Sequence, residues 1–410
     1  MSPIVTLCSL LTCLVLGGQP DLNSPFLNAL SQVPADTFAL EPHAEITFAD
    51  VSAGLGMRGL EVPVSWAALP DGAELQLLLA ALPGGLAPSL VQYVIIAGPE
   101  YPEVLGLDFF DISSTVTFGY PPSHGIAFIG EFDPEAITAA FGARGYEVTR
   151  SAGHGSLLCP AAGCDTGAHA DILNRMPANA FGGDLGRSFP VWANDRLVAG
   201  SPAIEVVETI AAVGNGDHRS MADYAEVHAL AAVLDAHAHV ATVTVVHPFR
   251  TAVPDMAHLV AGDAAPEDAF ETLLSAMGTH VLPPYALLAF ASVADGESES
   301  GLALLVYGDE DQATTAAAVI DARLDAFQSA VSGGSYRELY EQSGELQPSR
   351  VISDGATGLH TVVLRLEAPL PGGPEPAGAN AVRVGLPYMR LFGAVQQNDF
   401  LWLVPGGGSP

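Results

Sequence analysis

Two stretches of this sequence share one order of elements, and that shared order constrains the fold more than any other feature. In each stretch, two apolar segments separated by a short turn are followed by an acidic helix start. The second stretch begins about 170 residues after the first, which suggests a duplicated unit. The pattern predicts an α+β fold with two tandem modules, each an antiparallel or mixed sheet with helices packed on one face.

The first stretch predicts a hairpin and a helix. Residues 114–120 and 125–132 have the composition of strands, and the turn between them contains two prolines. Asp133 then occupies the N-cap position of a helix, with Pro134 at its first position, and the helix over residues 134–143 ends before Gly145.

The second stretch repeats this order. It predicts strands over residues 285–293 and 301–307, a turn at 295–297 and a helix over 312–331. Further along, residues 194–200 and 398–404 both begin with Asn-Asp and continue with apolar residues, and we expect each to form a strand at an equivalent place in its module.

The chain has 410 residues, which exceeds the usual size of one domain. Its N-terminal part is punctuated by proline and predicts a separate Pro-rich subdomain, with a helix over residues 73–82 and a helix or strand over 90–97. The expected division is a leader over 1–18, the N-terminal subdomain over 19–106, the first module over 107–250, a connecting helix and linker over 251–284, and the second module over 285–410.

The charge of the chain excludes several partners. It carries 46 acidic residues against 14 basic ones, a formal net charge of -32, and every basic residue is Arg. Nucleic acids and anionic lipids bind clusters of Lys and Arg, which this sequence lacks. The absence of Lys also excludes a phosphate loop that ends in Lys, and Schiff-base or Ser-Lys chemistry. The simplest interpretation of the charge is solubility.

Residues 3–18 form an uncharged apolar run of the length of a signal-peptide core, although no basic residue precedes it. Three outcomes remain open: cleavage after Gly17, lipidation of Cys13 within a degenerate lipoprotein box, or a retained anchor. We expect export to the extracellular space or the outer face of the envelope, with membrane contact only through this leader.

Beyond the leader, two cysteines remain, Cys159 and Cys164. The four residues between them include Pro160 and Gly163, which allow the chain to turn back on itself. In an oxidising compartment we expect a disulfide that closes this small loop.

Histidines form the one cluster of residues suited to metal chemistry. Asp235, His237 and His239 alternate at the start of an expected strand, so they would lie on one face of it, and His247 at its end keeps the same parity. With one more ligand such a set could hold zinc. The alternative is a helix-to-strand junction with solvated imidazoles.

Two other patterns are weaker. Acidic residues gather at Asp295, Glu297 and Glu299 and at Asp309, Glu310 and Asp311, but neither set has the spacing of a helix–loop–helix calcium site. Ser156 follows His154 in a glycine-rich segment that lacks the second glycine of a nucleophile elbow. We therefore expect no catalytic residue and no cofactor, with zinc or calcium as the minor alternatives.

Five segments carry a resemblance to a known group of proteins: Leu-Asp-Phe-Phe-Asp-Ile (107–112), Thr-Phe-Gly (117–119), Gly-Glu-Phe-Asp (130–133), Cys-Pro-Ala-Ala-Gly-Cys-Asp (159–165) and Asn-Ala-Phe-Gly-Gly-Asp-Leu-Gly-Arg (179–187). Through them the chain resembles, over roughly residues 30–250, an uncharacterised family of secreted proteins from Chloroflexota-type bacteria. It implies export and no known activity.

These observations favour an exported, acidic, non-enzymatic protein. It would act as a binding module or as a structural subunit of a cell-surface or envelope assembly, with a protein partner there. The alternative is a metal-dependent hydrolase that uses His237 and His239.

Overall fold

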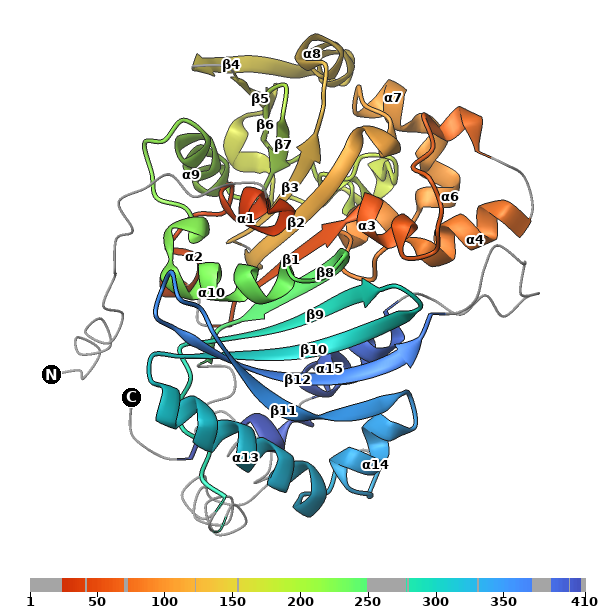
Figure 1. The fold of residues 1–410 in the computed structure, drawn as a ribbon. Coiled ribbons are helices and arrows are strands. Elements are labelled where there is room, and N and C mark those ends of the chain that lie inside the picture. The colour runs from red at the N-terminus through yellow and green to blue at the C-terminus, as the bar shows by residue number, and fades with distance from the viewer. Residues whose placement is uncertain are drawn as a thin grey trace, which may run out of the picture.

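The fold is built on one continuous antiparallel sheet (Figure 1). The computed structural model describes residues 24–40, 43–69, 73–121, 123–152, 155–248, 278, 280–329, 332–370, 385–397 and 399–406. Within them, 12 strands pair in the order β11-β12-β10-β9-β8-β1-β2-β3-β7-β6-β5-β4. The strands are β1 (Glu45–Asp50), β2 (Ile112–Tyr120), β3 (Ser123–Gly130), β4 (Tyr146–Ala152), β5 (Gly155–Pro160), β6 (Val191–Ala193), β7 (Leu197–Gly200), β8 (His239–Val246), β9 (Leu287–Asp295), β10 (Ser298–Tyr307), β11 (Glu345–Ser353) and β12 (His360–Pro369).

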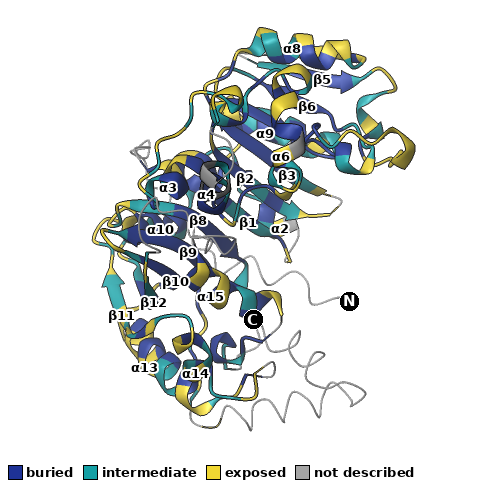
Figure 2. Ribbon diagram, turned by 90° about the vertical axis from the view of Figure 1, so that its right-hand side faces the viewer, coloured by how far each residue is buried: buried dark blue, intermediate teal, exposed yellow. Residues whose placement is uncertain are grey.

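Helices cover both faces of this sheet, so the expectation of helices on one face is wrong. One face carries a single apolar core that runs along both halves of the sheet beneath α1 (Pro25–Leu30), α9 (Ile204–Gly214) and α10 (Ala225–Leu234). This double coverage explains why β9 and β10 are buried along almost their whole length (Figure 2).

The opposite face carries two separate helical layers. Over the N-terminal half lie α3 (Val51–Gly56), α4 (Ala73–Ala81), α5 (Pro88–Val91), α6 (Val94–Ala97), α7 (Tyr101–Val104) and α8 (Pro134–Ala143). Over the C-terminal half lie α13 (Glu310–Ala326), α14 (Tyr336–Glu341), α15 (Leu386–Gln396) and the 3₁₀ turn η10 (Leu401–Leu403). The short helix α2 (Thr37–Leu40) follows α1.

The predicted helix caps are confirmed. Asp133 accepts hydrogen bonds from the backbone N–H groups of Glu135 and Ala136, at 2.9 and 3.3 Å, and so begins α8. Asp309 accepts one from Gln312 at 2.9 Å and begins α13, which ends at Ala326 and not at residue 331. The helix expected over residues 73–82 is α4, and residues 90–97 form parts of two short helices, not a strand.

Two other expectations need correction. β1 lies between β8 and β2, in the middle of the sheet, so residues 19–106 do not form a subdomain of their own. The chain over residues 401–403 is a 3₁₀ turn and not a strand, because Trp402 is buried in the C-terminal layer and its carbonyl is held by Arg323; Asn398 lies outside the described residues. Most of the connecting segment 251–284 also lies outside them.

The two halves of the sheet have related strand orders. From the centre outward, the C-terminal half reads β8-β9-β10-β12-β11 and the N-terminal half reads β1-β2-β3-β7-β6-β5-β4. Moving outward, each half has a central strand (β8 or β1), then one hairpin (β9–β10 or β2–β3), and later an outer hairpin (β11–β12 or β4–β5). In both halves the outer hairpin follows a helix in the chain. The N-terminal half has one additional hairpin, β6–β7, inserted between β3 and β5.

In the part of the chain that the structure describes, no helix combines the length and the apolar character needed to cross a membrane.

Candidate functional site

The three residues predicted from the sequence line one pocket, but they do not alternate along a strand. Asp235 caps the C-terminus of α10, His237 follows in the turn, and only His239 belongs to β8. The last turn of α10 continues through hydrogen bonds from the N–H of Asp235 to Ala231 O and from the N–H of His237 to Leu234 O, at 2.8 and 3.0 Å. The segment over residues 235–238, which was expected to begin a strand, is therefore a turn between α10 and β8.

We name this cavity the His–Asp pocket. It has a volume of about 650 Å³ and lies where α1, α3 and the start of β8 meet. Its lining includes two phenylalanines, Phe26 and Phe48, and six polar side chains: Ser24, Asp50, Ser52, Asp235, His237 and His239.

A carboxylate holds His237 in place. Its Nδ1 lies 2.5 Å from Oδ2 of Asp295, and Oδ1 of Asp295 accepts a hydrogen bond from the Ala238 N–H at 2.9 Å. Burial raises the pKa of Asp295, but the hydrogen bonds from Ala238 and His237 outweigh it and hold the pKa below its ordinary value. The Asp295 carboxylate therefore fixes the orientation of the His237 ring through Nδ1.

Asp50 is the most deeply buried carboxylate of the pocket. Only 8% of the residue is exposed, and its Oδ1 accepts hydrogen bonds from the Ser52 hydroxyl at 2.7 Å and the Ala53 N–H at 2.8 Å. Burial raises the pKa of Asp50, against the lowering effects of these bonds and of nearby His239. A buried carboxylate with a raised pKa is typical of functional sites.

Close packing fixes His239 and Asp235. A Cβ atom added at Gly56 would lie 2.7 Å from Cε1 of His239, so α3 can approach this ring because residue 56 has no side chain. The Ser24 hydroxyl donates to Oδ1 of Asp235 at 2.7 Å and connects α1 to the end of α10.

Among the described residues, no group of three His, Cys, Asp or Glu side chains is close enough to hold a metal ion. Zinc binding by Asp235, His237 and His239 therefore stays a prediction.

The two acidic segments considered for calcium have structural roles. Asp295 orients His237, Asp309 caps α13, and the buried Glu299 accepts a hydrogen bond from the Gly385 N–H at 2.9 Å.

His247, which was predicted to share the parity of these residues, and the upstream His218 lie elsewhere. His247 packs against the ring of Phe38 at 5.4 Å between centroids, and burial together with nearby His43 lowers its pKa. His218 is 3.6 Å from Asp36. The residues 153 and 154 that precede Ser156 lie outside the described part of the chain.

A second cavity adjoins the His–Asp pocket, and Ser52 lines both. We name it the amide cavity, because Asn28, Gln32, Asn194 and Asn215 contribute to its lining. Its volume is about 1020 Å³, and it also contains Asp111, Glu131, Asp195 and Arg196. Sequence reasoning missed this cavity and the roles of Ser24, Asp50 and Ser52, because the contributing segments are far apart in the chain. The one local signal was the N-cap pattern Asp-Val-Ser at residue 50.

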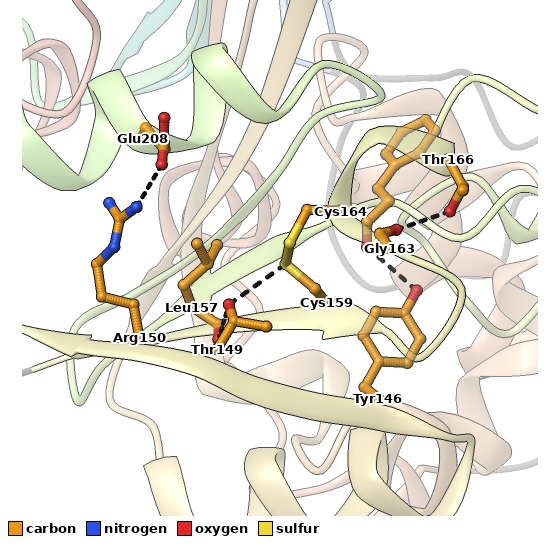
Figure 3. Close-up of a disulfide and its surroundings, with 10 residues drawn as sticks. Tyr146, Thr149, Arg150, Leu157, Cys159, Gly163, Cys164, Thr166 and Glu208 are labelled. Atoms are coloured by element: carbon orange, nitrogen blue, oxygen red, sulfur yellow. Dashed lines mark hydrogen bonds and ion pairs between the residues drawn. A yellow bond between two sulfur atoms is a disulfide. The ribbon is translucent and has the colours of Figure 1, made fainter.

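The predicted disulfide is confirmed (Figure 3). Cys159 at the end of β5 bonds to Cys164 with a Cα–Cα distance of 4.9 Å. Thr149 on β4 contacts Cys159 Sγ at 3.5 Å, and the neighbouring Tyr146 hydroxyl donates to Phe189 O at 3.1 Å. Cys13, the candidate for lipidation, lies outside the described residues.

No protein-family model and no curated protein matches the chain. Similar solved structures include crystal forms I, III and IV of TP0453, with 5%, 6% and 9% sequence identity and TM-scores of 0.29, 0.26 and 0.29. These matches cover 83% of this chain and 92%, 94% and 93% of the TP0453 chains. At this level of similarity the chain cannot be assigned to a family.

Proposed function

We propose that this chain is an exported binding protein of the cell surface or envelope and that the His–Asp pocket is its ligand site. One observation carries the proposal. Three separate segments of the chain contribute polar side chains to a single cavity: Ser24, Asp50, Ser52, Asp235, His237 and His239. A volume of about 650 Å³ lies within the range typical of small-molecule sites, about 300–1,000 Å³.

Two features support export. The apolar run over residues 3–18 has the character of a signal-peptide core, and the Cys159–Cys164 disulfide is of a kind that persists in oxidising compartments. The resemblance to secreted Chloroflexota-type proteins points the same way.

The preorganised state of the pocket supports binding. Asp295 and Ala238 fix His237, Ser24 fixes Asp235, and Ser52 and Ala53 fix one oxygen of Asp50. Side chains held in this way lose little further freedom when a ligand binds, which favours affinity.

The alternative proposal is a metal-dependent hydrolase. Its support is the Asp295–His237 contact, because a carboxylate behind a histidine is the usual arrangement that orients a metal ligand. His239 would be the second imidazole. Metal analysis of the purified protein separates the two proposals, since stoichiometric zinc would favour the hydrolase.

We also propose that the two halves of the sheet arose from one duplicated unit. The related strand orders support this, as do the capped helices α8 and α13 that follow the hairpins β2–β3 and β9–β10. The hairpin β6–β7 would then be an insertion in the first copy.

The binding proposal can be tested with the full chain, purified in a mild detergent. Thermal unfolding would be recorded with a panel of amines, amino acids, sugars, nucleotides, carboxylates and divalent cations. We expect one class to raise the Tm of the wild type, by an amount that grows with ligand concentration. Ser52→Trp should abolish the shift, because residue 52 lines both cavities and a much larger side chain there would obstruct ligand binding.

The matched control is Asp217→Asn, a change at an exposed position outside both cavities. This variant should keep the wild-type shift. A panel in which no compound raises the Tm, or a shift that Ser52→Trp leaves intact, would contradict the proposal.

A further inference from the structure

A third cavity lies near the start of β1, whereas the His–Asp pocket lies at the end of that strand. We name it the Arg187 cavity. Its volume is about 430 Å³, and it shares no lining residue with the His–Asp pocket or the amide cavity. Strands β1, β2 and β3, the helix α5 and the segment 182–189 contribute to its lining. The Arg187 cavity is therefore a separate place where a ligand could bind.

Arg187 gives the strongest indication of a ligand. Its Nε is buried and has no hydrogen-bond partner, and within the described part of the chain its guanidinium forms no ion pair. A buried donor without an acceptor is costly, because it has lost hydration that nothing replaces. The chain has 46 acidic residues and 14 basic ones, so an Arg that pairs with no carboxylate points to an acceptor supplied by a ligand.

Arg144 differs from Arg187, although it also has buried nitrogen atoms without a hydrogen-bond partner. The Cζ atom of Arg144 lies 4.2 Å from the ring centre of Phe141, and this cation–π contact stabilises its charge. No such ring contact is found for Arg187 among the described residues. The charge of Arg187 is thus unaccounted for by the chain itself.

A tight turn holds the backbone of Arg187 at the cavity. The N–H of Arg187 donates to Gly182 O at 2.9 Å, and Gly182 has a φ of 87°, which favours glycine. A Cβ atom added at residue 182 would lie 2.8 Å from Cβ of Arg187 and 2.6 Å from the Phe189 ring, so only glycine lets the turn pack this closely. Arg187 is therefore positioned before a ligand binds, which favours affinity.

The same turn brings a carboxylate to the cavity. Asp184 and Arg187 are three residues apart and both line the cavity, yet they form no ion pair with each other. A ligand that carries only negative charge would bind Arg187 but be repelled by Asp184, and a simple cation would meet the opposite problem. A ligand with one charge of each sign complements both residues.

The rest of the lining suits a peptide. The Ser89 hydroxyl is buried and, among the described residues, has no hydrogen-bond partner, so it can bond a peptide group. Phe118, Ile126 and Phe189 supply apolar surface for a side chain. A volume of about 430 Å³ lies within the range typical of small-molecule sites, about 300–1,000 Å³, and is larger than a single amino acid needs.

We propose that the Arg187 cavity binds a dipeptide, with its C-terminal carboxylate on Arg187 and its N-terminal ammonium group at Asp184. A guanidinium and a carboxylate can form two parallel charge-assisted hydrogen bonds, which are among the strongest in proteins. The Ser89 hydroxyl bonds the peptide group, and the apolar lining holds a side chain of the ligand. Because this site is separate from the His–Asp pocket, the inference goes beyond the proposed function and does not depend on it.

Isothermal titration calorimetry of the full chain tests the proposal, with alanylphenylalanine and two blocked forms of it as probes. N-acetylation removes the ammonium group, and amidation of the C-terminus removes the carboxylate. The unblocked dipeptide should bind the wild type, and each blocked form should bind about tenfold more weakly or less, because each has lost one of its two charge contacts.

Two variants assign each charge contact to its residue. Arg187→Met should weaken the unblocked dipeptide about tenfold or more and leave the amidated form unchanged, because that form has no carboxylate to lose. Asp184→Asn should weaken the unblocked dipeptide to the same degree and leave the N-acetylated form unchanged. A folding defect would weaken all three probes alike, so these patterns separate a lost contact from a lost fold. The matched control is Arg350→Met, a change at an exposed position of β11 outside the cavity, which should keep the affinity for the dipeptide within about twofold.

Three results would overturn the proposal: no binding of the unblocked dipeptide, equal binding of the three probes, or an unchanged affinity in Arg187→Met. None of them bears on the His–Asp pocket, because Ser52→Trp reports on that site and Arg187→Met on this one.

Discussion

Gly56 determines how closely α3 approaches His239, and it offers a test at the scale of one residue. Gly56→Ala would place a Cβ atom 2.7 Å from the ring, so the ring must move within the pocket. We expect a cost of about 1–3 kcal/mol from overpacking, reduced by up to about 1 kcal/mol because Ala favours a helix more than Gly. Urea unfolding measures the net change.

The matched control is Gly142→Ala in α8, where an added Cβ atom meets no atom within 4 Å. Only the helix preference applies there, so this variant should gain about 0.4–1 kcal/mol. Gly56→Ala and Gly142→Ala with equal effects would contradict the close packing of His239 on α3.

The contact between Asp295 and His237 predicts a pH dependence of stability. The folded-state pKa of Asp295 is below its ordinary value of 3.8, so the folded protein favours the ionised form. The stability contributed by this carboxylate is therefore complete above pH 3.8 and is lost as the pH falls through the folded-state pKa.

The comparison of wild type with Asp295→Asn isolates this contribution. Urea unfolding between pH 2.5 and 6 should give a difference in unfolding free energy that is largest at the upper end and shrinks as the pH falls. A difference that grows on acidification would mean that Asp295 is not stabilised as the carboxylate.

At the scale of elements, Arg323 of α13 connects the helix to the end of the chain. Its buried guanidinium donates to the carbonyls of His280 at 2.8 Å and Val404 at 2.6 Å, and burial lowers its pKa to about 10. Arg323→Met leaves these buried carbonyls unsatisfied, and we expect a loss of about 3 kcal/mol and faster hydrogen exchange over residues 399–406.

The control for this change is Arg337→Met. Arg337 forms ion pairs with Asp325 and Glu341 at the surface, and such pairs contribute about 0–1 kcal/mol. If Arg323→Met costs no more than Arg337→Met, the carbonyl contacts do not hold the C-terminal segment.

The Cys159–Cys164 disulfide is a second test at this scale. The loop is small, so the chain-entropy model gives a contribution of about 2 kcal/mol. Intact mass after alkylation, with and without reductant, should show these two cysteines blocked only after reduction. Alkylation of both without reductant would show that they are free in the isolated protein.

Elements whose signals are local were predictable, and those fixed by distant contacts were not. The hairpins and the caps Asp133 and Asp309 follow from neighbouring residues. The segment ending in Val404 has the apolar composition of a strand but forms a 3₁₀ turn, because Arg323 and Tyr336 bind its backbone from elsewhere in the chain.

The residues of the candidate site also fall into a group with a local signal and a group fixed by distant contacts. Asp235, His237 and His239 stand out because they are adjacent in sequence, whereas Asp50 and Asp295 join them only through the pairing of β1 with β8 and of β8 with β9. The N-cap pattern at Asp50 is local, but it does not predict that Asp50 lies beside these residues.

At the scale of the whole molecule, the core on one face joins the two halves. It extends from Trp192 near one end of the sheet to Val363 near the other, so neither half has this core to itself. We therefore expect one cooperative unfolding transition.

Two single-tryptophan variants test this expectation. One retains Trp192 in the N-terminal half and the other retains Trp402 in the C-terminal half, and the remaining tryptophans are replaced by Phe. In each variant, tryptophan fluorescence and far-ultraviolet circular dichroism should report one and the same urea midpoint. Fluorescence and circular dichroism midpoints that separate within a variant would indicate two independent domains.

The central claim is that a ligand occupies the His–Asp pocket, and histidine resonances report on it directly. With ¹³Cε1-labelled histidine, signals assigned by single His→Gln variants would be followed by NMR as the compound that raises the Tm is added. His237 and His239 line the pocket, whereas His218 and His360 lie outside both cavities. If a ligand occupies the pocket, the signals of His237 and His239 should shift saturably while those of His218 and His360 stay unchanged. The reverse pattern, in which His218 and His360 shift and the two pocket histidines do not, would contradict ligand binding in the His–Asp pocket.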